Sequence, residues 1–163
     1  MIHVAPEQSL STILRQLFED RYYTMDLFTD ADIRGDLCEM PFGTDSIDIF
    51  MANHVLEHIK DDLRAMREIY RILKPQGSAL LQIPIDLSLA VTEEAPEKAP
   101  PQDLLKLFGQ EDHVRQYGTD FKDRLEQSGF TVRTHICHDI ITPDEIKTYG
   151  LHSDEIVWEA FKS

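Results

Sequence analysis

The stretch DSIDIFMANHVLEHIKDDLRAMREIYRILKPQGSALLQIP, residues 45–84, decides the fold. It contains two short apolar runs, residues 47–52 and 79–83, and each is typical of a strand buried on both faces. Between them, apolar residues recur at steps of three and four from Leu63 to Leu73, which predicts an amphipathic helix that is stopped by Pro75 and Gly77. A strand, a crossover helix and a second strand predict a parallel βαβ unit.

The residues before this unit predict more of the same sheet. A short apolar run over residues 2–5 is broken by Pro6 and Glu7 and is followed by an amphipathic helix from Leu10 to Phe18. A second strand over residues 22–25 ends in Asp26, and a weaker, polar strand over 32–36 suits the edge of the sheet. This order is the opening of a nucleotide-binding α/β fold.

The residues after the unit begin with a long segment, 86–112, that is rich in Pro and Glu. It is expected to be a loop with one helical turn at 103–108 and is a candidate lid over a site, since long loops in compact domains are usually functional or disordered. A helix should follow, with Tyr117, Phe121 and Leu125 on one face. Strands over 130–136 and 156–161, separated by a short helix from Thr142, are expected to pair antiparallel at the end of the sheet.

Length and composition narrow the class of protein. A chain of 163 residues predicts one domain over 1–163. No apolar run approaches the ~20 residues that cross a membrane, and two cysteines without metal-ligand spacing favour the cytoplasm. The net charge of −14 repels polyanions, so a nucleic-acid substrate is disfavoured.

Several motifs together resemble the class I S-adenosylmethionine-dependent methyltransferases of type 11. The motifs are Met40-Pro-Phe42, Ser46-Ile-Asp48, His54-Val-Leu-Glu-His58, Arg67-Glu-Ile-Tyr-Arg-Ile-Leu-Lys-Pro75 and Gly77. The resemblance covers most of the chain and implies a doubly wound, Rossmann-like α/β fold with seven strands in the order 3-2-1-4-5-7-6, the last strand antiparallel. It also implies S-adenosylmethionine as cofactor and methyl transfer to an acceptor that is expected to be a small molecule.

Carried over position by position, the resemblance implies a set of cofactor contacts at the ends of the strands. The residues next to the methionine moiety are Ala5, Pro6 and Glu7; those next to the ribose and adenine are Asp26, Leu27, Asp36 and Leu37; those facing the transferred methyl are Asn53, His54 and Val55. Independently of the resemblance, Asp26 lies about twenty residues past the first turn, where an acidic side chain reaches a ribose diol in this class of fold. Asp26 and Asp36 alternatively serve only as turn residues.

The first turn, Val4-Ala5-Pro6-Glu7, lacks the G-x-G of dinucleotide enzymes. Those glycines let the backbone approach a pyrophosphate, and Glu7 would place a like charge there. A nicotinamide enzyme is therefore disfavoured. S-adenosylmethionine carries no phosphate and has two cationic groups, so an acidic turn tolerates it.

Three histidines, an arginine and a tyrosine are candidates for acceptor chemistry. His54 and His113 are candidate bases, because their ordinary pKa lies near neutrality. His58, Arg115 and Tyr117 are candidate substrate contacts; the alternatives are a His58 that packs under the turn with a backbone hydrogen bond and a Tyr117 in the core. The run His54 to His58 also matches the zinc motif H-x-x-E-H, but the first histidine is expected on a loop, and no metal is predicted.

A second hypothesis of a different class is a methyltransferase-like domain that binds a ligand or partner without catalysis. The absent glycines support it, and so does a chain that starts at its first strand, without the helices that precede this strand in most relatives. The cleft would then be open unless residues 86–112 or the second subunit of a homodimer covered it.

Overall fold

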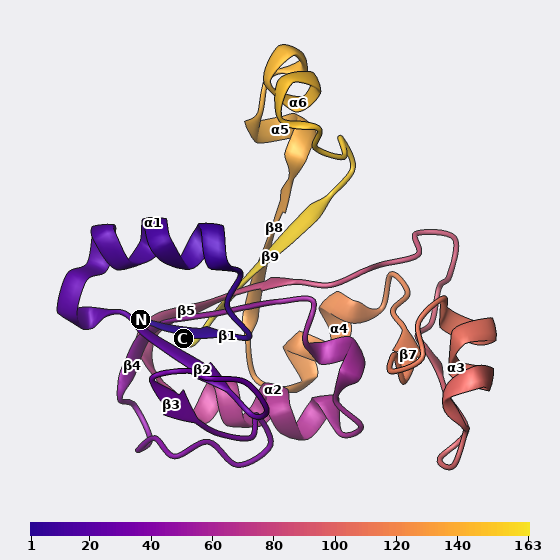
Figure 1. Ribbon diagram of the computed structural model, residues 1–163, viewed down its shortest axis with the longest axis horizontal. Helices are drawn as coiled ribbons and strands as arrows, with labels where there is room; N and C mark the ends of the chain where they lie inside the picture. Colours follow the sequence, from indigo (N-terminus) through magenta and orange to yellow (C-terminus); the bar gives the residue numbers. More distant parts are fainter.

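The central unit forms as its sequence predicts, in a computed structural model that describes residues 1–163 (Figure 1). Strand β4 spans Ile47–Asn53, helix α2 spans Asp62–Ile72, and strand β5 spans Leu73–Gln82 and pairs parallel with β4. The Asp61 side chain caps α2 by accepting a hydrogen bond from the Arg64 N–H, which satisfies a helix donor that lacks a partner within the helix. The buried face of α2 includes Ala65, Met66, Ile69 and Ile72.

The other elements extend the sheet on both sides of this unit. On the N-terminal side they are β1 (Ile2–Val4), α1 (Gln8–Phe18), the 3-10 turn η1 (Glu19–Arg21), β2 (Tyr23–Asp26) and β3 (Ile33–Arg34). On the C-terminal side of β4 and β5 they are the 3-10 turn η2 (Leu56–His58), β6 (Glu93–Glu94), α3 (Pro101–Phe108), β7 (Arg115–Gln116), α4 (Phe121–Gln127), β8 (Thr131–Ile136), α5 (Cys137–Ile140), α6 (Pro143–Tyr149) and β9 (Ile156–Phe161).

The sheet order is β3-β2-β1-β4-β5-β9-β8. β9 pairs antiparallel with both β5 and β8, whereas the pairs among β1 to β5 are parallel. This confirms the predicted sheet, in which the last strand of the chain inserts next to β5. In Figure 1, α1 lies on one side of the sheet and α2 with α4 on the other, and the β8–β9 hairpin extends away from the body with α5 and α6 at its tip.

The two faces of the sheet are buried to different degrees. Phe50, Ala79 and Leu81 are fully buried on the face that packs with α2 and α4. On α1, by contrast, Ile13 and Leu17 are 55% and 67% exposed. The hydrophobic core therefore lies mainly between the sheet and the α2–α4 layer.

Two predicted elements differ in detail from the structure. The segment 86–112 contains more regular secondary structure than the predicted loop with one helical turn. It includes the helix α3 and the strand β6, which pairs with β7. Tyr117 does not belong to the following helix, because α4 begins only at Phe121. Tyr117, Phe121 and Leu125 are nevertheless all fully buried, so their shared apolar character reflects the core and not one helical face.

None of the helices is long and apolar enough to cross a membrane.

Candidate functional site

A hollow of about 450 Å³ lies beside the carboxyl ends of β1, β2 and β4. Its volume falls in the range of ~300–1,000 Å³ that is usual for small-molecule sites. The residues that line it are Val4, Ala5, Asp26, Leu27, Phe28, Gly35, Asp36, Leu37, His54, Val55, His58, Ile59 and Asp112. Three of them are carboxylates and none is lysine or arginine, so the charge of the hollow favours a cationic ligand over a phosphate.

Asp26 and Asp36 are each held by a turn while they line the hollow. Oδ1 of Asp26 accepts hydrogen bonds from the N–H groups of Phe28 and Thr29, both at 2.7 Å, and Oδ1 of Asp36 accepts one from Cys38 at 2.8 Å. Burial opposes the ionisation of Asp26, but the backbone donors prevail and hold the pKa of this carboxyl below its usual value. The turn role and a ligand role are therefore compatible, since the turn uses one oxygen of each carboxylate.

The first turn is shaped without glycine. Ala5 has a φ of 45°, in the left-handed region that normally favours glycine, and lies exposed at the hollow. Glu7 points elsewhere: its carboxylate bonds with Nε2 of His3 at 3.0 Å and with Nδ2 of Asn53 at 3.0 Å. The turn is thus tied to β1 and to the end of β4 by side chains.

The end of β4 turns sharply into the hollow. His54 has a φ of 52°, and η2 begins two residues later at Leu56. His54 and His58 therefore do not share an α-helical face, as the H-x-x-E-H zinc motif would require. Nδ1 of His54 lies 3.5 Å from Oε1 of Glu57, whose carboxylate is fully buried without any hydrogen-bond partner. Burial raises the pKa of Glu57 to about 7.

His58 and His113 meet where two distant segments come together. The N–H of Val114 donates to the carbonyl of Glu57 at 2.9 Å, which holds the residues before β7 against η2. Nδ1 of His58 lies 3.2 Å from the carbonyl of Asp112, and the rings of His58 and His113 meet edge to face with centroids 4.7 Å apart. Burial, and then the neighbouring His58, lower the pKa of His113. His58 faces the hollow, whereas His113 lies behind it at 5% exposure.

Arg115 and Tyr117 are buried and do not line the hollow, so the prediction that they contact substrate there receives no support from the structure. Arg115 is 1% exposed and donates to the carbonyls of Leu56, Ile59 and Lys60 and to the carboxylate of Glu94. The Tyr117 hydroxyl is buried and donates to Asp62 at 2.8 Å. These contacts fix the segment that carries η2, so both residues shape the wall of the hollow from behind it. Neither of them lines the hollow.

The structure gathers most of the predicted cofactor contacts in one place. Those that line the hollow are Ala5, Asp26, Leu27, Asp36, Leu37, His54 and Val55; those that do not are Pro6, Glu7 and Asn53. Five further residues that line the hollow were not predicted from the sequence, namely Val4, Phe28, Gly35, Ile59 and Asp112. Each of the five is adjacent in sequence to a predicted site residue, and this adjacency was the only available signal for them. The hollow as a cofactor site stays a prediction.

Comparison with known proteins gives the family context of this site. A family model described as a methyltransferase domain matches residues 5–81. A protein of Mycolicibacterium smegmatis described as "Probable S-adenosylmethionine-dependent methyltransferase/" is 32% identical over 104 residues, which are 63% of this chain and 36% of that protein. The chain thus spans about a third of the length of this curated relative.

Solved structures share the fold at low sequence identity. An S-adenosylmethionine-dependent methyltransferase from Mesorhizobium loti has a TM-score of 0.64 at 16% identity, covering 99% of this chain and 89% of that one. The 1,6-didemethyltoxoflavin-N1-methyltransferase of Burkholderia thailandensis, with bound 1,6-didemethyltoxoflavin and S-adenosylhomocysteine, has a TM-score of 0.62 at 16% identity, covering 99% of this chain and 71% of that one.

Proposed function

We propose that the chain is a class I methyltransferase of type 11, in agreement with the methyltransferase family model and the curated relative that it matches, and that it transfers the methyl group of S-adenosylmethionine to a small-molecule acceptor. The observation that carries the proposal is the hollow at the ends of β1, β2 and β4, lined by Asp26, Asp36 and Asp112 without any lysine or arginine. A ligand with a sulfonium and an ammonium and no phosphate suits this charge. The pyrophosphate of a nicotinamide cofactor does not.

Each part of the cofactor has a proposed place in the hollow. The Asp26 oxygen that its turn does not use would accept from the ribose hydroxyls, as acidic residues at the end of a second strand do in this class of fold. Leu27 and Leu37 offer apolar contact for the adenine, and Asp36 an acceptor for its amino group. The methyl would then face the end of β4 at His54 and Val55.

The chemical step needs little from the protein beyond placement. Methyl transfer is an in-line displacement in which the acceptor forms a bond to the methyl carbon as the carbon–sulfur bond breaks, and the sulfonium charge is lost. Alignment of the three atoms and exclusion of water supply the main rate advantage. His54, half exposed at the hollow, is the proposed base if the acceptor must lose a proton. His113 is too enclosed for direct contact with an acceptor.

The small-molecule acceptor is supported by the Burkholderia neighbour, which acts on a small heterocycle. The relatives are methyltransferases, so they give the non-catalytic alternative no support over methyl transfer.

We also propose that a second subunit covers the hollow, because Phe28 lies at its rim with 87% of its surface exposed. Sedimentation equilibrium tests this, and a monomer at all concentrations would contradict it. A cytoplasmic location is consistent with the free thiols of Cys38 and Cys137.

Cofactor titration by calorimetry tests the proposal, with Asp26→Asn as the variant and Asp30→Asn as its control. Asparagine keeps the carbonyl oxygen that accepts from Phe28 and Thr29, so the turn should persist. A charged hydrogen bond is worth about 1.5–3 kcal/mol, so Asp26→Asn should weaken binding roughly 10- to 100-fold. The exposed Asp30 does not line the hollow and its variant should bind like the wild type. Failure of the wild type to bind S-adenosylmethionine at millimolar concentration would refute the proposal.

A further inference from the structure

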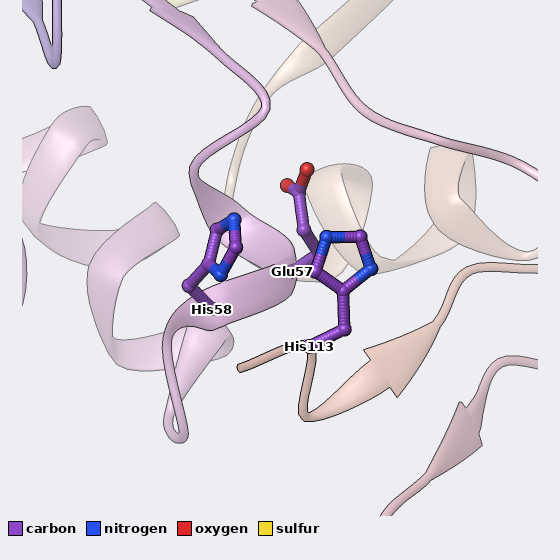
Figure 2. Close-up of side chains that lie close together, drawn as sticks. All are labelled: Glu57, His58 and His113. Atoms are coloured by element: carbon purple, nitrogen blue, oxygen red, sulfur yellow. The ribbon is translucent and has the colours of Figure 1, made fainter. Parts of the chain in front are cut away.

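Glu57, His58 and His113 form a cluster of side chains whose donor atoms all lie within 4.8 Å of one another. Figure 2 shows their carboxylate and ring ends grouped together, Glu57 and His58 from η2 and His113 from the segment before β7. From these residues we propose a binding site for one divalent transition-metal ion, with Zn²⁺ as the ion best suited to the donors.

The buried carboxylate of Glu57 is the strongest observation. Its side chain is 1% exposed, and neither oxygen has a hydrogen-bond partner. A buried carboxylate without a donor is costly, and proteins usually pair such a group or give it a metal. Neighbouring basic groups do not relieve it: Nδ1 of His54 lies 3.5 Å from Oε1 without forming a hydrogen bond, and Arg115 directs its nitrogens at three carbonyls and at Glu94. A metal ion would supply the missing partner.

One of the two histidines, His58, has the hydrogen-bond surroundings expected of a metal ligand. A ligating histidine usually donates its other ring N–H to a carboxylate or carbonyl, which leaves the second nitrogen free for the metal. Nδ1 of His58 is in contact with Asp112 at both kinds of oxygen, 3.2 Å from the carbonyl and 3.3 Å from the carboxylate. His113 is 5% exposed and makes its ring contact with His58. Both imidazoles are thus held close to Glu57.

The donor set and its spacing favour zinc. Two imidazoles and one carboxylate are a known catalytic zinc set, with an open fourth position. Ligand atoms about 2.1 Å from one tetrahedral ion lie about 3.4 Å apart, so donors that are now up to 4.8 Å apart would have to approach one another by somewhat more than about 1 Å, which side-chain rotation can supply. This differs from the H-x-x-E-H interpretation, since His54 is not a ligand and Glu57 binds the ion directly. The ion would lie behind His58, at the wall of the hollow.

Direct metal titration tests the site without any cofactor. The full-length chain is freed of metal with a chelator and titrated with Zn²⁺ by calorimetry, and with Co²⁺ while its visible absorption is recorded. We expect one Zn²⁺ per chain and a tetrahedral Co²⁺ spectrum. Glu57→Gln and His113→Gln should each weaken Zn²⁺ binding at least about tenfold. His135→Gln, which removes a partly buried histidine bound to Glu159, should bind Zn²⁺ like the wild type.

Two outcomes would overturn the site: absence of stoichiometric Zn²⁺ binding, or equal binding by the wild type and Glu57→Gln. Glu57→Gln replaces an unpaired buried charge with a neutral side chain of the same shape, so it should fold, and circular dichroism checks this. At the same Zn²⁺ concentration, the metal should raise the melting temperature of the wild type by more than that of Glu57→Gln. S-adenosylmethionine is titrated separately into metal-free protein, so failure of the metal site and failure of the proposed function give different results.

Discussion

Replacement of Arg115 by lysine tests how the wall of the hollow is held. The Arg115 guanidinium bonds with the carbonyls of Leu56, Ile59 and Lys60 and with Glu94, and its side chain is 1% exposed. Lysine keeps the charge, but a single ammonium nitrogen cannot reproduce the planar fork. We expect it to lose at least two of these four contacts.

The magnitude follows from the buried character of these bonds. Two lost hydrogen bonds to a charged donor at about 1.5–3 kcal/mol each give a loss of roughly 3–6 kcal/mol in the free energy of unfolding. This agrees with the ~3–5 kcal/mol that is typical when a buried charged partner is removed. It is a large share of the ~5–15 kcal/mol that stabilises an ordinary domain. The freed segment carries Glu57 and His58, so binding at the hollow and at the proposed metal site should weaken as well.

Urea denaturation followed by circular dichroism measures the loss. The matched control is Arg133→Lys, the same substitution at a side chain that is 66% exposed and lies 3.4 Å from Glu159. Such a surface pair contributes ~0–1 kcal/mol, so the control should be nearly as stable as the wild type. If Arg115→Lys lowers the free energy of unfolding by less than about 1 kcal/mol, the buried Arg115 guanidinium does not hold the segment that carries η2, and the reasoning fails.

Three further predictions concern the first turn, a buried contact and acid stability. Ala5→Gly should raise the free energy of unfolding by up to ~1 kcal/mol, since Ala5 has a φ of 45°, whereas Ala31→Gly should lower it; thermal denaturation distinguishes the two. Gly129→Ala should cost ~2 kcal/mol or more, because its φ is +106° and a Cβ would lie 3.1 Å from the Tyr70 ring; Gly109→Ala, at +78° with open space, should cost about half as much, and equal losses in urea denaturation would contradict this. The hydrogen bond from Arg71 outweighs burial and lowers the pKa of Glu68, so Glu68 stabilises the fold fully above its ordinary pKa of 4.5 and loses this effect as pH falls through the lower folded-state pKa. Glu68→Gln should therefore be less stable than the wild type at neutral pH and approach it in acid, and a constant difference across the pH series would count against it.

Part of the site was within reach of sequence reasoning because it lies at the ends of predictable strands. Asp26 is the last residue of β2 and Asp36 comes just after β3, so the order of the strands was enough to bring both into one hollow. The burial of Arg115 and Tyr117 was not predictable, because a charged or hydroxylated side chain after an acidic loop resembles a surface element. Their burial depends on carbonyls and a carboxylate that lie 55 to 61 residues away along the chain.

The sequence alone determined the βαβ unit, because hydrophobic period and turn residues act between neighbours and need no knowledge of the rest of the chain. Only the tertiary structure decided that His113 lies against Glu57 and His58, that Glu7 bonds with His3 and Asn53 instead of facing a ligand, and that Arg115 holds η2. These contacts join segments that are distant in sequence, and their geometry depends on the packing of the whole sheet and its connections.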